Sequence, residues 1–97
     1  MPIKIFTNDH EQREIAWLCD DNWRLPDQIE FLEQWLHKNA SVLPGTECIV
    51  DVGFCARNDA RGGGTAMSPQ YLGELAKNNI RLFLSEYDAV VVPTAGD

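Results

Sequence analysis

The sequence has few of the features that mark membrane-bound, secreted or disulfide-stapled proteins. No apolar run approaches the ~20 residues that a membrane-spanning helix needs, and the polar residues near the start do not resemble a signal peptide. The three cysteines, Cys19, Cys48 and Cys55, form neither a CxxC pair nor an even-numbered disulfide framework. We therefore expect a cytoplasmic protein with reduced thiols and no membrane contact.

Basic residues are scarce. Eight Lys and Arg residues stand against 15 Asp and Glu residues, and the net charge is −7. This balance argues against nucleic acid, because nonspecific binding depends on cations that neutralise phosphates, and against anionic membranes. It is compatible with a basic protein partner, whose association a complementary field would speed. An acidic surface that serves only solubility is the alternative.

Histidine is also rare, and the sequence shows no catalytic or metal-binding constellation. His10 lies beside Asp9 and Glu11, whose side chains point in other directions, and no second histidine lies at the short spacing that is typical of transition-metal sites. Cys55 follows an apolar run but has no histidine partner in sequence, which a cysteine nucleophile needs. We predict no enzyme, no cofactor and no metal. An enzyme would require Cys55 or Asp51 to meet one of the histidines in space.

What is present fits one α+β domain over residues 1–97, a length that provides one hydrophobic core. Alternating or continuous apolar residues predict strands at 2–7, 47–56 and 80–85, with a further strand or short helical turn at 14–19. Pro26 and the pair Ser68-Pro69 mark two helix starts. We predict a four- to five-stranded sheet with two main helices packed on one face.

Periodicity indicates which residues these elements bury. In the first helix, over 25–39, the apolar stripe comprises Ile29, Leu32, Trp35 and Leu36. In the second helix the apolar face is expected to comprise Leu72, Leu75 and Ala76. The even-numbered residues of the central strand, Cys48, Val50, Val52 and Phe54, form a wholly apolar face that should meet the helices.

The segment 57–67 is a glycine-rich loop between a strand and a helix start, and it is the first candidate site. Glycines permit close backbone approach to a ligand, helix N-termini attract anions, and arginines fork onto carboxylates or phosphates. A small anionic or polar ligand would be held by Arg57, Arg61, Gly62, Gly63, Gly64 and Ser68. The loop matches neither a P-loop nor the GxGxxG pattern, and a surface connection is the alternative.

The second candidate site is an interaction surface. Glu30 and Glu33 lie one turn apart on the first helix and share a face. Trp23 stands in a polar stretch, where an exposed aromatic residue could anchor a partner. We predict binding of a basic protein through these three residues, and the alternative is a solvated helix face. The apolar run 89–92 could form an edge strand through which two copies pair.

Three segments resemble a family of small bacterial domains of unknown function, some of which are assigned as immunity proteins. The segments are a DxGF strand at Ile49–Phe54, an SPxxL helix start at Met67–Leu72 and a closing strand at Ile80–Tyr87. They cover about two-fifths of the chain. The resemblance implies an α+β fold and a non-enzymatic, immunity-like interaction module, or a protein carried on a mobile element. It implies no functional residue.

Overall fold

The computed structural model describes residues 2–19, 21–57 and 61–88. The elements follow in the order β1 (Ile3–Thr7), β2 (Glu14–Leu18), α1 (Leu25–Asn39), a short 3-10 helix η1 (Ala40–Val42), β3 (Cys48–Cys55), α2 (Pro69–Lys77) and β4 (Ile80–Tyr87). The predicted α+β class with a four-stranded sheet and two main helices is confirmed. Of the two alternatives for 14–19, the strand is confirmed over Glu14–Leu18, and the expected strand at 89–92 lies outside the described residues.

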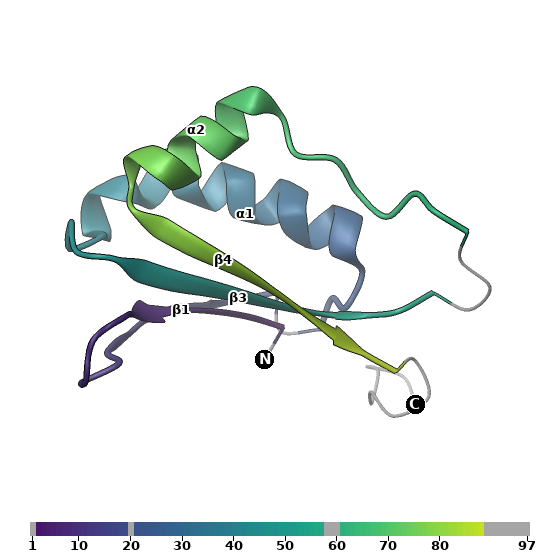
Figure 1. Ribbon diagram of the computed structural model, residues 1–97, viewed down its shortest axis with the longest axis horizontal. Coiled ribbons are helices and arrows are strands. Elements are labelled where there is room, and N and C mark those ends of the chain that lie inside the picture. The colour runs from purple at the N-terminus through teal and green to yellow at the C-terminus, as the bar shows by residue number, and fades with distance from the viewer. Residues whose placement is uncertain (1, 20, 58–60, 89–97) are drawn as a thin grey trace.

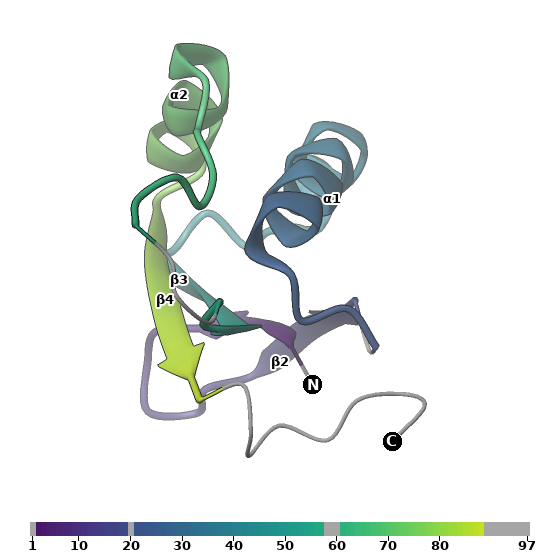
Figure 2. The same cartoon turned by 90° about the vertical axis from the view of Figure 1, so that its right-hand side faces the viewer.

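The sheet is mixed, with strand order β2-β1-β3-β4. β1 is antiparallel to both β2 and β3, whereas β3 and β4 run parallel. α2 connects the two parallel strands, and both helices cover the same face of the sheet (Figures 1 and 2). The opposite face, which we call the open face, carries Lys4, Trp17, Asp51 and Phe83 among other side chains.

The core lies between the helices and the covered face of the sheet. Ile3 and Ile5 of β1 and Val50 and Val52 of β3 are fully buried there. From α1, Ile29, Leu32 and Leu36 pack against them, while Trp35 is partly buried and Phe31 is exposed. Gln28, also buried, donates through its amide to the carbonyls of Asn22 (2.6 Å) and Gly53 (2.7 Å), which ties the start of α1 to β3.

α2 begins as the sequence predicts but turns a different face to the core. The hydroxyl of Ser68 accepts a hydrogen bond from the backbone N–H of Tyr71 at 3.0 Å, and Pro69 opens the helix. Tyr71 and Leu75 are buried, whereas Leu72 is 50% exposed and Ala76 is also exposed. The expected face of Leu72, Leu75 and Ala76 was therefore wrong in two of its three residues. The large ring of Tyr71, one helical turn before Leu75, fills the core position instead.

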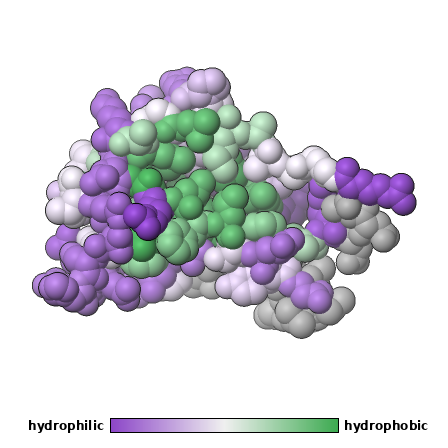
Figure 3. Space-filling model, in the orientation of Figure 1, coloured by the Kyte–Doolittle hydropathy of each residue, from purple (hydrophilic) through white to green (hydrophobic). Residues whose placement is uncertain are grey.

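Apolar side chains remain exposed on one side of the molecule. In the orientation of Figure 1, β4 and α2 face the viewer. Figure 3 has the same orientation and shows apolar residues gathered over these two elements. Leu72 of α2 and Phe83 and Leu84 of β4 are 50%, 43% and 46% exposed.

Candidate functional site

The first hollow in the surface is a groove of about 830 Å³ at the carboxyl ends of β3 and β4, which we call the strand-end groove. It lies where the segment before α1 crosses the end of β3 and meets the glycine-rich loop. In open α/β sheets ligands bind outside the carboxyl ends of parallel strands. The lining includes Trp23, Arg24, Asp27, Cys55, Arg57, Gly64 and Glu86.

Trp23 forms a wall of the strand-end groove. Its indole meets the ring of Tyr87 edge-on, with centroids 5.8 Å apart and the planes at 89°. Its backbone carbonyl accepts a hydrogen bond from the N–H of Cys55 at 2.9 Å, so the segment before α1 continues the pairing along β3. Trp23 is therefore a half-buried, positioned side chain rather than the freely exposed anchor that the polar sequence around it suggested.

Arg57 also lines the groove, but its guanidinium closes the glycine-rich loop. It donates to the carbonyl of Gly62. Gly62, Gly63 and Gly64 all adopt positive φ angles, which only glycine adopts without strain. A Cβ on Gly63 would lie 3.2 Å from Nη2 of Arg57. The loop therefore folds back on its own arginine.

The charge of the strand-end groove is mixed. Three carboxylates, those of Asp21, Asp27 and Glu86, line it beside two guanidiniums. Nη1 of Arg24 lies 3.8 Å from Oδ2 of Asp27, and Asn22 donates to the same carboxylate oxygen. The arrangement favours a polar ligand over a strongly anionic one, because the carboxylates offset the arginines.

The residues predicted for the ligand site do not all lie at one place in the structure. Arg57 and Gly64 line the strand-end groove, whereas Arg61 and Ser68 are absent from its lining. Ser68 lies instead beside α1, where its hydroxyl donates to Oε2 of Glu33 at 3.3 Å. The N-terminus of α2 therefore faces a carboxylate, which opposes an anion at that point.

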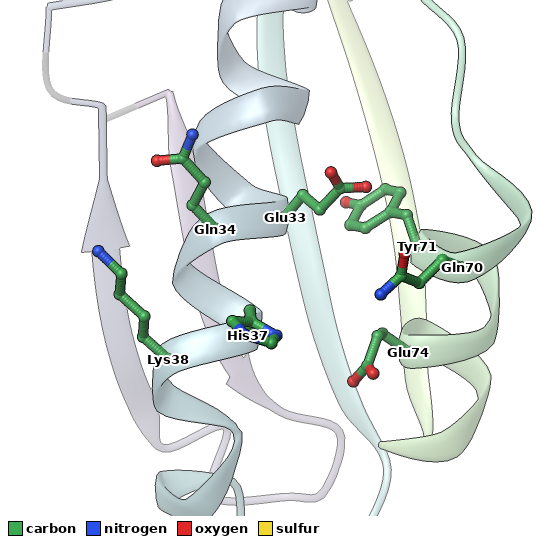
Figure 4. Close-up of a pocket in the computed structure, with 7 residues that line it drawn as sticks. All are labelled: Glu33, Gln34, His37, Lys38, Gln70, Tyr71 and Glu74. Atoms are coloured by element: carbon green, nitrogen blue, oxygen red, sulfur yellow. The ribbon is translucent and has the colours of Figure 1, made fainter.

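The second hollow is a smaller cleft of about 250 Å³ between α1 and α2, which we call the interhelical cleft. Figure 4 shows its lining: Glu33, Gln34, His37, Lys38, Gln70, Tyr71 and Glu74. Glu33 and His37 extend from α1 toward α2, and Tyr71 and Glu74 extend from α2 toward α1 (Figure 4). Lys38 points away from α2, so the groups that face each other across the cleft carry two carboxylates and no ammonium.

The interhelical cleft contains a buried hydroxyl group, that of Tyr71, without a hydrogen-bond partner among the described residues. The side chain of Tyr71 is fully buried. Buried polar groups are nearly always paired, and an unpaired one costs about 1–3 kcal/mol. Burial raises the pKa of the Tyr71 hydroxyl well above its ordinary value, and the negative charge of Glu33 raises it further. The hydroxyl therefore stays protonated.

Of the residues predicted for a partner surface, only Glu33 lines the interhelical cleft. Glu30 is exposed elsewhere on α1, and Trp23 belongs to the strand-end groove. Sequence reasoning missed Tyr71, His37 and Glu74. Their signal in the sequence is i,i+4 spacing, which places Glu33 and His37 on one face of α1 and Gln70 and Glu74 on one face of α2, but the sequence does not say which helix faces meet.

The groups that would be needed for catalysis are placed apart. Asp51 accepts a hydrogen bond from the hydroxyl of Ser85 at 2.6 Å on the open face. Cys55 lines the strand-end groove, and no histidine is among the lining residues. Within the described part of the chain, no three His, Cys, Asp or Glu side chains gather closely enough to hold a metal ion.

Searches against protein-family models, curated proteins and solved structures found no match to this chain. The resemblance to small bacterial domains therefore stays a prediction. Among the described residues, no helix is both long and apolar enough to cross a membrane.

Proposed function

We propose that this protein is a non-enzymatic interaction module that binds a basic protein partner, and that a Lys or Arg side chain of the partner enters the interhelical cleft. One observation carries the proposal. The buried hydroxyl of Tyr71 has no partner among the described residues, and it lies between two helices whose facing carboxylates are Glu33 and Glu74. A cationic side chain in the cleft would pair with the carboxylates, and a small separation of α1 and α2 on binding would let it donate to the hydroxyl oxygen, which is buried in the free protein.

The charge of the whole chain supports the same partner. A net charge of −7 steers a basic protein toward this surface and raises its association rate, most strongly at low salt. Contacts inside a cleft act differently from this general field, because they mainly slow dissociation. The two contributions can be separated experimentally by comparing Glu33 with Glu30, which carries the same charge on the same helix but lies outside the cleft.

The test uses an arginine- and lysine-rich peptide as the probe and a glutamate-rich peptide of equal length as the control. Amide resonances of the protein are followed by NMR as each peptide is added. We expect the basic peptide to shift signals around Glu33 and Tyr71, with an affinity that falls as salt rises. The acidic peptide should leave these signals unchanged. A basic peptide that leaves the cleft signals unmoved would contradict the proposal.

Variants sharpen the test. Glu33→Gln and Glu74→Gln should each weaken binding about tenfold, a loss of about 1.4 kcal/mol. Glu30→Gln is the matched control. It should lower the association rate slightly and leave the dissociation rate unchanged. Tyr71→Phe should weaken binding while the fold stays intact. Equal effects of Glu30→Gln and Glu33→Gln would mean that the net charge of the protein attracts the peptide and that the interhelical cleft has no specific part in binding.

A second candidate function is the binding of a small polar ligand in the strand-end groove. The observation that favours it is the convergence of Trp23, Arg57 and Gly64 on one groove of about 830 Å³ at the carboxyl ends of parallel strands. A thermal-shift screen tests it with neutral polar molecules such as sugars and nucleosides, and with phosphate, nucleotides and carboxylates as the anionic comparison. A ligand at a hundred times its Kd stabilises by about 2.7 kcal/mol, which raises Tm by on the order of 10 °C in a domain of this size.

Arg57→Ala should abolish such a shift, because Arg57 lines the strand-end groove. Arg61→Ala is the matched control, since Arg61 lies outside that lining and should leave the shift intact. If no compound raises Tm, or if both variants keep the rise in Tm, the glycine-rich loop is only a connection between β3 and α2 and not a ligand site.

A further inference from the structure

The outer edge of β4 offers a row of backbone groups to another strand. On its inner side, the carbonyls of Asn79 and Tyr87 accept hydrogen bonds from the N–H groups of Cys48 (3.0 Å) and Ala56 (2.9 Å) of the β3 segment. Backbone groups of a parallel strand alternate in direction from residue to residue. The N–H and C=O groups that point outward are therefore those of Ile80, Leu82, Leu84 and Glu86.

Within residues 2–19, 21–57 and 61–88, no strand pairs with this side of β4. The strand spans eight residues, and Phe83 and Leu84 at its middle are 43% and 46% exposed. Long apolar edges of this kind are sites of strand pairing unless charges, prolines or bulges interrupt them. β4 carries only two charged side chains, Arg81 and Glu86.

We propose that β4 pairs with β4 of a second copy of this chain, antiparallel and about a two-fold axis that passes between the two Phe83 residues. An axis perpendicular to the sheet keeps the helices of both copies on the same face. In this register every outward-pointing residue of β4 is paired. Leu82 lies opposite Leu84 of the second copy, and Ile80 lies opposite its Glu86.

The apolar side chains match in this register. The two Phe83 side chains meet on the open face at a pair that is not hydrogen-bonded, where opposite residues approach most closely, about 4.5 Å between Cα atoms. On the helix face, each Leu84 packs beside Leu82 of the other copy and loses its exposure to water. Aromatic and aliphatic cross-strand pairs are the contacts that stabilise antiparallel strands.

Charge complementarity points to a second copy rather than to an unrelated strand. Arg81 of one copy lies opposite Ser85 of the other, on the open face. The hydroxyl of Ser85 donates to Oδ1 of Asp51 at 2.6 Å, so a carboxylate is held beside the place that the arginine enters. The two-fold axis repeats this opposite-charge contact. Within its own chain, Arg81 lies 3.6 Å from Glu47 in a partly exposed ion pair, which stabilises little.

The two-fold contact is isologous, which means that it uses the same β4 edge of both copies. No free β4 edge remains after pairing, so this edge forms a dimer and not a growing fibre. The surface is also separate from the interhelical cleft, and the dimer does not depend on the proposed binding of a basic partner.

The test is the mass in solution, measured by sedimentation for the wild type and for Phe83→Lys, Phe83→Glu and Phe31→Lys. We expect the wild type at concentrated conditions to have twice the chain mass of 10.9 kDa. Phe83→Lys and Phe83→Glu should each be monomers, because like charges meet at the axis. Phe31 is 48% exposed on α1, so Phe31→Lys is the matched control and should remain a dimer.

Mixing the two Phe83 variants gives the decisive result. The lysine of one copy meets the glutamate of the other, so an equimolar mixture should regain the dimer mass. This recovery also shows that both variants are folded. A wild type that stays monomeric, a Phe83→Lys variant that stays dimeric, or a mixture that stays monomeric would each overturn the proposal.

Discussion

The hydroxyl of Tyr71 and the carboxylate of Glu33 face each other between α2 and α1, yet no hydrogen bond joins them. The carboxylate accepts instead from Ser68, the residue that caps α2. Glu33 therefore accepts a hydrogen bond from the N-cap residue of α2, while the buried hydroxyl of Tyr71 beside it stays unpaired. The unpaired hydroxyl lowers the stability of the free protein, and under the proposed function it is the group that the partner's cationic side chain would contact.

Tyr71→Phe should stabilise the free protein. The substitution keeps the ring in the core and removes a buried hydroxyl that has no partner among the described residues. We expect the free energy of unfolding to rise by about 1 kcal/mol, measured by urea denaturation. Tyr87→Phe is the control, because Tyr87 is 45% exposed and should change little. A clear loss of stability in Tyr71→Phe would mean that the hydroxyl is bonded.

The stability of the wild type should fall at alkaline pH more steeply than that of Tyr71→Phe. In the unfolded chain the tyrosine pKa is near 10, whereas burial and Glu33 raise the pKa of Tyr71 in the folded state. Above about pH 10 the unfolded state therefore loses a proton that the folded state retains, and stability declines until the folded pKa is passed. Denaturation at several alkaline pH values measures the difference. Parallel curves for the two proteins would contradict the prediction.

Leu75→Ala and Leu72→Ala should differ although the residues are three positions apart on one helix. Leu75 is 6% exposed and packs in the core, so its truncation should cost about 2–4 kcal/mol. Leu72 is 50% exposed, so its truncation should cost less than about 0.5 kcal/mol. Thermal unfolding distinguishes them as a large and a small fall in Tm. Similar losses would indicate that α2 is turned toward the face expected from periodicity.

Ser68→Ala should cost about 1 kcal/mol, because it removes the hydroxyl that accepts from the N–H of Tyr71. Aspartate is normally as good a cap as serine. Here Ser68→Asp should be less stable than the wild type, because the new carboxylate would lie beside that of Glu33. Adding Glu33→Gln should recover the stability. Additive effects of the two substitutions in a double-mutant cycle would exclude this coupling.

Features that depend on neighbours in the chain could be predicted from the sequence. Pro26 and Ser68-Pro69 indicated both helix starts, because capping and the fixed φ of proline act within one turn. Alternation identified the strands, and the apolar even-numbered face of β3 indicated the side that the helices cover. Leu72 shows the limit of such reasoning. Periodicity placed Leu72 in the core and left Tyr71 out of the expected apolar face, although the area of the Tyr71 ring outweighs its one hydroxyl when the helix packs on the sheet.

The candidate sites required contacts between distant segments. The sequence placed Arg57 and Ser68 in one site because they flank one loop, yet Arg57 lines the strand-end groove and Ser68 lies beside Glu33 of α1. It placed Glu30 and Glu33 together on α1 but gave no sign that Glu74 faces Glu33. Helix caps, element types and the acidic charge follow from local chemistry and composition. Which faces meet, and which polar group is left unpaired between them, depends on how the whole core packs.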